Sequence, residues 1–150
     1  MSFEARLQEL GYTVEPIEPN AGKIMRAVRT GKLVYTSGQV SAWDGQVIKG
    51  RLGRDLSVEQ GYEAARFCAL NCLRAIKGVA GSLDNIAQVV KVLGMVNVAP
   101  DFVDTPPVIH GCSDLLLQVF GEAGRHARSA VGMTIPENYA VEIEMIVELK

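Results

Sequence analysis

The sequence predicts an α+β domain in which helices cover one face of a mainly antiparallel sheet. Two segments, residues 57–80 and 105–120, repeat apolar residues at the three- and four-residue spacing of a helix. Strand-like segments lie before, between and after them, and the last, residues 139–149, alternates apolar and mostly acidic side chains. One face of the sheet should therefore pack under the helices, and the other is left to solvent or to another subunit.

The N-terminal third is expected to contain a short helix and a hairpin. Residues 3–10 place apolar side chains at helical spacing, and residues 16–22 form a connector rich in turn-forming residues. Residues 32–40 are rich in β-branched and aromatic side chains, which favour a strand. The Asp44-Gly45 pair then predicts a turn into a partner strand.

The sequence also predicts where the two long helices begin. Ser57 and Gln60 have the spacing of a capping box, which predicts a helix start at this point. Pro106 and Pro107 are tolerated only in a first helical turn, so they mark the start of the next helix. The remaining strands are expected at residues 87–98, 127–134 and 139–149.

Length and composition predict one soluble domain. The 150 residues fit a single domain, residues 1–150, in which residues 1–21 form the N-terminal helix and connector. A net charge of -2 and a pI of about 5.7 provide no basic surface for nucleic acid. No segment has the length and apolarity of a signal peptide or a membrane span. We therefore expect a cytoplasmic protein without a nucleic-acid or membrane partner.

Three cysteines, Cys68, Cys72 and Cys112, are an odd number, which fits a reducing compartment. Cys68 and Cys72 are one helical turn apart, where small apolar side chains of the core also occur. Only two histidines are present, and no second ligand pair has zinc spacing. A place in the core is favoured over a metal site, and no metal is expected.

Arg128 stands out because it heads a run of small and apolar residues in a predicted strand. A buried guanidinium is costly unless it is paired. One explanation is a structural ion pair with a glutamate of the last strand, such as Glu142. The other is a bound carboxylate, to which a planar guanidinium presents paired donors that lysine cannot copy. On the residues alone, the ion pair is the simpler explanation.

Three stretches of the chain resemble the RidA/YjgF family of small trimeric proteins, which carry the labels enamine/imine deaminase and endoribonuclease L-PSP. They are "GKLVYTSGQV" (31–40), "NCLRAIKGVAGSLDNIAQVVKV" (71–92) and "ARSAVGMTIPENYAVEIEMIVEL" (127–149). The resemblance extends from about Gly22 to Leu149. The segment "HGCSDLLLQVFGEAGRHARSAVG" (110–132) is similar to one branch of the family, with a Gly-x-Ser-Asp-Leu helix and a Gly-x-His lead into the arginine.

The resemblance implies a chorismate-mutase-like fold with a mixed sheet, and a homotrimer with a barrel-like centre and clefts between subunits. It also implies deamination of 2-imino or 2-enamino acids to 2-oxo acids and ammonia, without a cofactor. By position, Arg128 matches the arginine that grips the substrate carboxylate, and Glu142 the glutamate that positions the hydrolytic water. Gly38 matches a pocket-lining glycine, and Ser129 is expected to line the pocket as well. A carboxylate that moves a proton contributes roughly 10²- to 10⁴-fold to a rate.

Three positions depart from the family pattern. Ile24 stands where active members carry a tyrosine, His110 where many carry an asparagine, and Ala130 where some carry a cysteine. The tyrosine hydroxyl is therefore missing. His110 could replace it in the site, or it could be an ordinary packing or capping residue at the start of the helix.

These departures keep an alternative function open. In place of the deaminase, the chain could be a non-catalytic trimer that binds a small carboxylic acid or a protein partner. The ribonuclease label is disfavoured because the chain is acidic and lacks a basic, aromatic stripe. His126 is expected to shape the loop before Arg128, and Trp43 to pack beside the Asp44-Gly45 turn.

Overall fold

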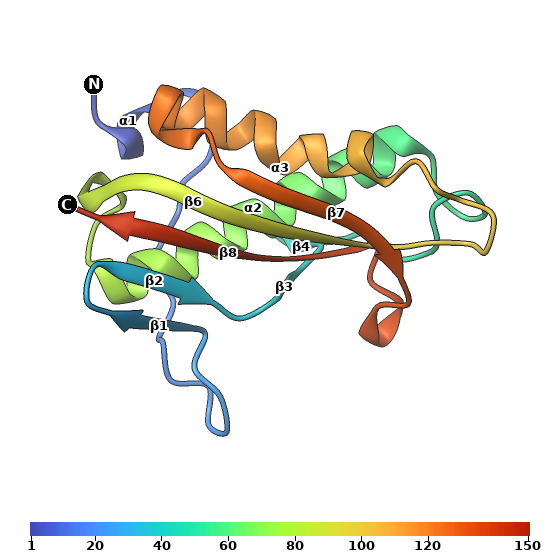
Figure 1. The fold of residues 1–150 in the computed structure, drawn as a ribbon, viewed down its shortest axis with the longest axis horizontal. Helices are drawn as coiled ribbons and strands as arrows, with labels where there is room; N and C mark the ends of the chain where they lie inside the picture. Colours follow the sequence, from blue (N-terminus) through green and yellow to red (C-terminus); the bar gives the residue numbers. More distant parts are fainter.

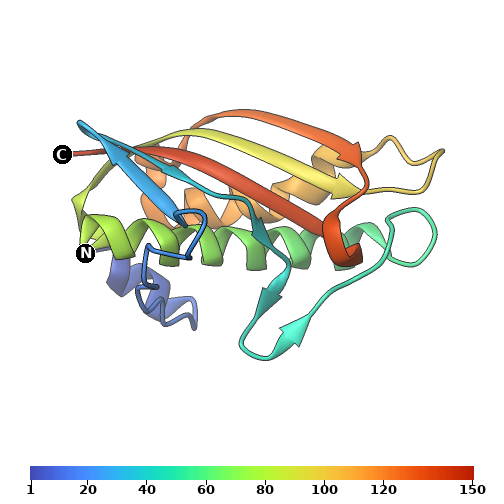
Figure 2. The ribbon, with the colours of Figure 1, turned by 90° about the horizontal axis from the view of Figure 1, so that it is seen from below.

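A six-stranded sheet with two long helices against one face forms the body of the protein (Figures 1 and 2). The computed structural model describes residues 1–150. Helix α2 spans Val58–Ala80 and helix α3 spans Thr105–Phe120. In Figure 2 both helices lie on the same side of the sheet, and no element covers the other side. The predicted α+β class is confirmed, and so is the uncovered sheet face.

The sheet is mixed, with the strand order β1-β2-β8-β6-β7 and β3 attached to β8. Its strands span Ala27–Thr30 (β1), Leu33–Thr36 (β2), Gln39–Val40 (β3), Ile86–Asn97 (β6), Ala127–Met133 (β7) and Val141–Leu149 (β8). Only the β6–β7 pair is parallel, because α3 carries the chain back before β7 begins. Strand β7, which bears Arg128, therefore forms one edge of the sheet.

Strand β8 has the predicted alternation of faces. Its odd-numbered residues are buried, with exposed fractions of 4% or less. Its even-numbered side chains, three of them glutamates, stay at least partly exposed. The set expected under the helices is confirmed, and Glu142 and Glu144 lie on the open face.

The predicted pairing of the first long strand is wrong. Strand β2 ends at Thr36 and pairs with β1, which the sequence did not predict, across a turn at Gly31 and Lys32. The Asp44-Gly45 turn does form, with φ angles of 50° and 77°. It joins only two short strands, β4 (Ala42–Trp43) and β5 (Gln46–Val47), in a separate small sheet.

The physical reason for this difference lies beyond the strand itself. The chain after β3 is hydrogen-bonded to helix α2. The Asn71 side-chain amide donates to the carbonyls of Ala42 at 2.6 Å and Val40 at 3.3 Å. Val40 still pairs with Glu142 in the sheet, but Ala42 is bonded to the helix and begins the separate β4–β5 sheet. Strand β1 gave little sequence signal because three of its four residues are exposed.

The helix boundaries agree with their sequence signals. The Ser57 hydroxyl accepts from the Gln60 backbone, and the Gln60 side chain accepts from the Ser57 backbone, so the capping box is present. Pro106 and Pro107 occupy the first turn of α3. Helices α2 and α3 then cross closely at Gly111, where a Cβ atom would collide with the backbone carbonyl of Tyr62. No helix of the structure has the length and apolarity to cross a bilayer.

The N-terminal helix α1, Phe3–Glu9, docks against both long helices. Leu7 is buried in the core, and the Phe3 ring meets the Phe120 ring edge-on at 4.7 Å between centroids. Glu4 forms an ion pair with Lys77 at 2.9 Å and accepts from the Leu83 backbone. This segment is therefore an integral part of the single core.

All three cysteines lie in the core. Burial raises the pKa of each thiol, that of Cys72 to about 12. The thiol form is therefore the stable one at neutral pH, and these side chains act as small apolar core residues.

Candidate active site

Arg128 lies in a groove between the edge strand β7 and helix α3. The sheet register pairs Arg128 with Val92, which is fully buried under the helices, so Arg128 projects toward the helix side. The groove has a volume of ≈ 400 Å³. It is lined by His110, Ser113, Asp114, Leu117, Arg125, His126 and Arg128. The chain thus gathers both of its histidines around the arginine.

One nitrogen of the Arg128 guanidinium is held by helix α3. The Nη1 group donates to His110 Nδ1 at 3.0 Å and to Ser113 Oγ at 3.2 Å. None of the three ion pairs of the structure involves Arg128, so it has no carboxylate partner within the chain. Its Nη2 and Nε groups make no hydrogen bond to the protein, which leaves donors for an external acceptor. The ion pair with Glu142 does not form within one subunit.

His126 continues this network behind the arginine. Its Nε2 atom is 2.9 Å from Ser113 Oγ, and its Nδ1 atom is 2.6 Å from the carbonyl oxygen of Gly124. Burial lowers the pKa of His126, the positive charge of Arg128 lowers it further, and the Gly124 carbonyl partly opposes both. The neutral imidazole is therefore favoured at neutral pH. His126 shapes the loop before β7, as expected, and it also supports the site.

Glu142 and Gly38 meet on the other side of the sheet. A Cβ atom at position 38 would lie 2.8 Å from the carboxyl carbon of Glu142, so only glycine leaves room for this carboxylate. The Glu142 side chain has no hydrogen-bond partner in the chain. Burial raises the pKa of Glu142, and the negative charge of Glu144 raises it further. Glu142 is therefore a carboxylate that holds a proton more readily than an ordinary one.

The sheet separates Arg128 from Glu142 within one subunit. Glu142 is in register with Met95 and, through it, with Val131, whereas Arg128 is in register with Val92. Because side chains alternate along a strand, these two registers belong to opposite faces. The chain therefore carries two separate half-sites: Arg128 with His110 on the helix side, which we call the arginine half-site, and Glu142 with Gly38 on the open side, the glutamate half-site.

The two other expected site residues lie apart from both half-sites. Ser129 is exposed on the open face, in a hollow of ≈ 580 Å³ that Glu144 and Tyr35 also line. Ile24 lies in the loop before β1 with an exposed fraction of 61%. A single subunit brings neither of them to Arg128.

The open face is apolar as well as acidic. Val28, Tyr35, Val131 and Met133 have exposed fractions of 50%, 42%, 40% and 39%. The strand registers place all four on the open face, together with Glu142 and Glu144. An exposed apolar surface on a sheet is typical of a site of association.

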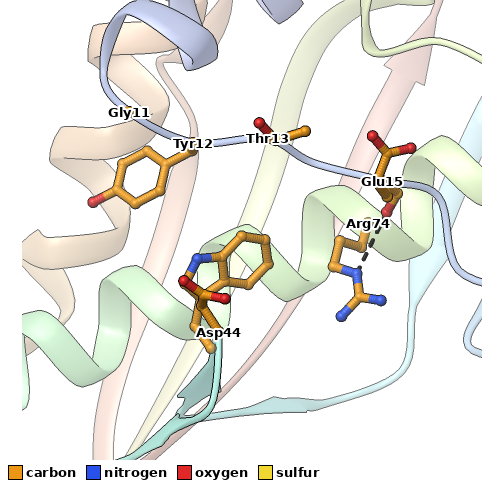
Figure 3. Close-up of a pocket in the computed structure, with 7 residues that line it drawn as sticks. Gly11, Tyr12, Thr13, Glu15, Asp44 and Arg74 are labelled. Carbon is orange, nitrogen blue, oxygen red and sulfur yellow. Dashed lines mark hydrogen bonds between the residues drawn. The ribbon is translucent and has the colours of Figure 1, made fainter.

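A second concave region lies across α2, where the segment after α1 passes the β4–β5 hairpin (Figure 3). Tyr12, Glu15, Asp44 and Arg74 line it, and the Trp43 ring packs under the Arg74 guanidinium at 5.9 Å. Arg74 also donates weakly to the Glu15 carbonyl at 3.4 Å. This pocket marks the seam between the N-terminal segment and the helix, and Trp43 serves in packing, as expected.

Comparison with known proteins identifies the family. The family model described as "YjgF/chorismate mutase-like, putative endoribonuclease" matches residues 4–149. Protein TCP17 of Trypanosoma cruzi is 40% identical over 148 residues, which cover 97% of this chain and 92% of the relative. The chain therefore belongs to the YjgF/chorismate mutase-like family.

Two crystal structures extend this similarity to the whole fold. A protein of unknown function from Agrobacterium tumefaciens, Atu1372, has 41% identity and a TM-score of 0.90, with 99% of this chain and 92% of that chain covered. A structure from Shewanella oneidensis described as a putative endoribonuclease has 32% identity and a TM-score of 0.92, with 99% and 100% covered. The N-terminal segment lies within both coverages.

The sequence did not identify Ser113 and His126 as partners of Arg128. Both residues lie in the segment "HGCSDLLLQVFGEAGRHARSAVG" (110–132). Their spacing of 13 residues spans the last turns of α3 and the return to β7. Only the packing of α3 beside β7 brings them together.

Proposed function

We propose that the protein is a hydrolase that deaminates reactive 2-imino or 2-enamino acids to 2-oxo acids and ammonia. The observation that carries this proposal is the Arg128 guanidinium, which has two acceptors on one nitrogen and no carboxylate partner. A substrate carboxylate would complete its hydrogen bonding through Nη2 and Nε. No metal or cofactor takes part in the proposed reaction.

The charges around Arg128 favour an anionic ligand. The groove contains a second arginine, Arg125, and its single carboxylate, Asp114, accepts from the Tyr62 hydroxyl at 2.7 Å. The pocket of Figure 3, by contrast, is lined by one arginine, Arg74, and two carboxylates, Glu15 and Asp44, that would repel an anion. Of these two arginine-lined regions, the groove is the better receptor for a carboxylate.

Glu142 supplies the proton transfer in this proposal. Its carboxylate would take a proton from a water molecule as the water oxygen attacks the imine carbon. The same proton would then reach the nitrogen and give a carbinolamine. A second proton would pass from its new hydroxyl group to the nitrogen through the Glu142 carboxylate. The carbon–oxygen double bond would then form as the carbon–nitrogen bond breaks, and ammonia would leave with a 2-oxo acid as the second product. A raised pKa suits this exchange because the group must both accept and return the proton near neutral pH.

The proposal also includes a homotrimer with a barrel-like centre. The two half-sites face opposite sides of one sheet, so they can form a common cleft only if they come from different subunits. Association through the open face would also bury the exposed apolar side chains of Val28, Tyr35, Val131 and Met133. Ser129 and Ile24 would then reach a cleft only where two subunits meet.

The test is turnover of freshly generated 2-iminopropanoate by the wild type and two arginine variants. Arg128→Ala should lower kcat/KM by at least about 100-fold, because charge-assisted hydrogen bonds to a carboxylate are lost. Arg74→Ala is the matched control, since it removes an arginine from the other pocket and should leave turnover within about two-fold. Wild-type rates in an Arg128→Ala protein of unchanged oligomeric state would overturn the proposal.

A binding protein without catalysis is the second candidate. The observation that favours it is Ile24, an exposed apolar residue at the position where active relatives are expected to carry a tyrosine. This candidate predicts that pyruvate raises the melting temperature of the wild type but not of Arg128→Ala, with no ammonia released from any imino acid. Release of ammonia above the uncatalysed rate would exclude it.

The acidic open face weighs against a nuclease. Glu142, Glu144 and Glu148 line one side of β8, and their negative charges would repel a phosphate backbone. Any RNA cleavage that persists unchanged in Arg128→Ala, Glu142→Gln and His110→Ala would therefore come from a contaminant.

A further inference from the structure

We propose that Ser113 and His126 are a positioning pair that orients the Arg128 guanidinium for its ligand. This inference rests on the proposed role of Arg128 in binding a carboxylate. It gives a role to Ser113 of the Gly-x-Ser-Asp-Leu motif and to His126 of the Gly-x-His motif, which the proposed reaction does not use.

The hydrogen bonds of the pair have a fixed direction. The Gly124 carbonyl can only accept, so His126 Nδ1, at 2.6 Å, carries the ring proton. In the neutral ring Nε2 is then an acceptor, and the Ser113 hydroxyl donates its only proton to it across 2.9 Å. The lone pairs of Ser113 Oγ remain for Arg128 Nη1 at 3.2 Å. Serine is thus held as an acceptor toward the arginine.

This arrangement matters because a serine hydroxyl normally rotates. Without His126, the Ser113 hydroxyl proton could point toward the guanidinium. Two hydrogen-bond donors would then face each other, and no bond would form between them. His110 Nδ1 accepts from the same nitrogen at 3.0 Å, so two acceptors fix Nη1 from α3. A guanidinium fixed at one end presents its free Nη2 and Nε edge in one orientation, which lowers the entropy lost when a carboxylate binds.

The surroundings of His126 keep it neutral. The charged or titratable groups that share its groove are Asp114 and His110 of α3, Arg125 of the preceding loop, and Arg128 of β7. Asp114 is engaged by Tyr62 at 2.7 Å, and Arg125 faces Glu122 at 3.4 Å. Burial and the positive charge of Arg128 both lower the pKa of His126 and so disfavour an imidazolium.

The experiment is pyruvate binding, measured by calorimetry at pH 7.5, to matched pairs of variants of the full chain. Ser113→Ala should weaken binding about 10-fold, because one hydrogen bond to a charged group is lost, while Ser113→Thr keeps the hydroxyl and most of the affinity. His126→Leu should weaken binding similarly. His126→Gln should retain most of the affinity, because its amide oxygen can accept where Nε2 did.

A double-variant test distinguishes a positioning role of Ser113 from a purely structural one. In an Arg128→Lys background, Ser113→Ala should have no further effect on pyruvate affinity, because the group that it positions is absent. Unchanged affinity in Ser113→Ala and His126→Leu, with Arg128→Ala still abolishing binding, would overturn the positioning role alone. Equal losses in the paired variants, or additive losses in the lysine background, would also overturn it. Unchanged binding in Arg128→Ala would instead overturn the proposed function.

Discussion

The arginine half-site and the glutamate half-site are built in opposite ways. On the helix side, the Arg128 guanidinium donates to two side chains of α3, His110 and Ser113. Ser113 is hydrogen-bonded in turn to His126, and His126 to the Gly124 carbonyl. On the open side, Glu142 has no hydrogen-bond partner and rests against the bare backbone of Gly38. The Arg128 guanidinium is therefore held in one orientation by hydrogen bonds, whereas no hydrogen bond fixes the Glu142 carboxylate.

The two half-sites suit different tasks in the proposed reaction. A group that binds a carboxylate gains from a fixed orientation, because ordering is completed before the ligand arrives. A group that moves a proton gains from a shifted pKa and an open coordination sphere, in which water can take the place of a protein partner. The two requirements fit different faces of the sheet.

Replacement of Gly111 should have the largest effect, because it breaks the frame of the arginine half-site. The added methyl group of Gly111→Ala would collide with the backbone carbonyl of Tyr62, and neither helix can yield locally. We expect a loss of about 3 kcal/mol or more in the free energy of unfolding, measured by urea denaturation.

The control for this variant is Gly61→Ala in α2. The atoms nearest its methyl group would belong to side chains, of Leu52 at 2.8 Å and Val108 at 3.0 Å, and side chains shift more readily than backbone. It should cost clearly less than Gly111→Ala. A stable Gly111→Ala protein that binds pyruvate normally would show that close helix crossing does not set the groove.

Removal of the Glu142 charge should separate chemistry from binding. Glu142→Gln keeps the shape of the side chain but cannot accept the proton of water, so kcat should fall by roughly 10²- to 10⁴-fold. Pyruvate affinity should stay within about three-fold of the wild type, because the proposed contact of the carboxylate is with the arginine half-site. Steady-state kinetics and calorimetry together check this prediction. A variant that loses affinity but keeps kcat would reverse the assigned roles.

Gly38→Ala should have a smaller effect of the same kind. The new methyl group would meet the flexible Glu142 side chain at 2.8 Å, so the carboxylate would move while the backbone stays in place. We expect kcat to fall about 10-fold and the free energy of unfolding to change by less than about 1 kcal/mol. A crystal structure of the variant should show Glu142 in a different rotamer. An unchanged rotamer and unchanged kcat would count against a catalytic position for this carboxylate.

The smallest effect concerns pH. The pKa of Glu142 is raised in the folded state, so its ionised form costs stability at neutral pH, and this cost is relieved as the pH falls toward the ordinary range of a glutamate. The wild type should therefore gain stability relative to Glu142→Gln as the pH falls from 7 to about 4.5. Glu144→Gln removes a repelling charge, so it should lower the pKa of Glu142 and shift the acidic limb of the kcat profile to lower pH.

Elements with a local cause could be predicted, and those with a distant cause could not. The capping box at Ser57 and the alternation of β8 depend on neighbouring residues, and both are present. The path after Val40 was mispredicted because the bonds that hold it come from Asn71, in a helix many residues later. The same holds for the site: the arginine is visible in sequence, but its supports Ser113 and His126 become visible only when α3 lies beside β7.

The separation of Arg128 and Glu142 by the sheet could not be predicted from the family motif either. The resemblance led to the expectation that both residues line one pocket, and a linear sequence does not show on which face of a sheet a residue lies. Strand register resolves the question within one chain, because Val92 and Met95 place their neighbours on opposite faces.

Mixing two inactive variants tests the shared cleft most directly. Arg128→Ala lacks one half-site and Glu142→Gln the other, so every subunit in the mixture is defective. If each cleft takes its arginine and its glutamate from different subunits, random co-assembly should restore about one quarter of the wild-type deaminase activity, because that share of clefts receives both intact residues. Co-assembly verified by mass spectrometry with no recovered activity would contradict the account.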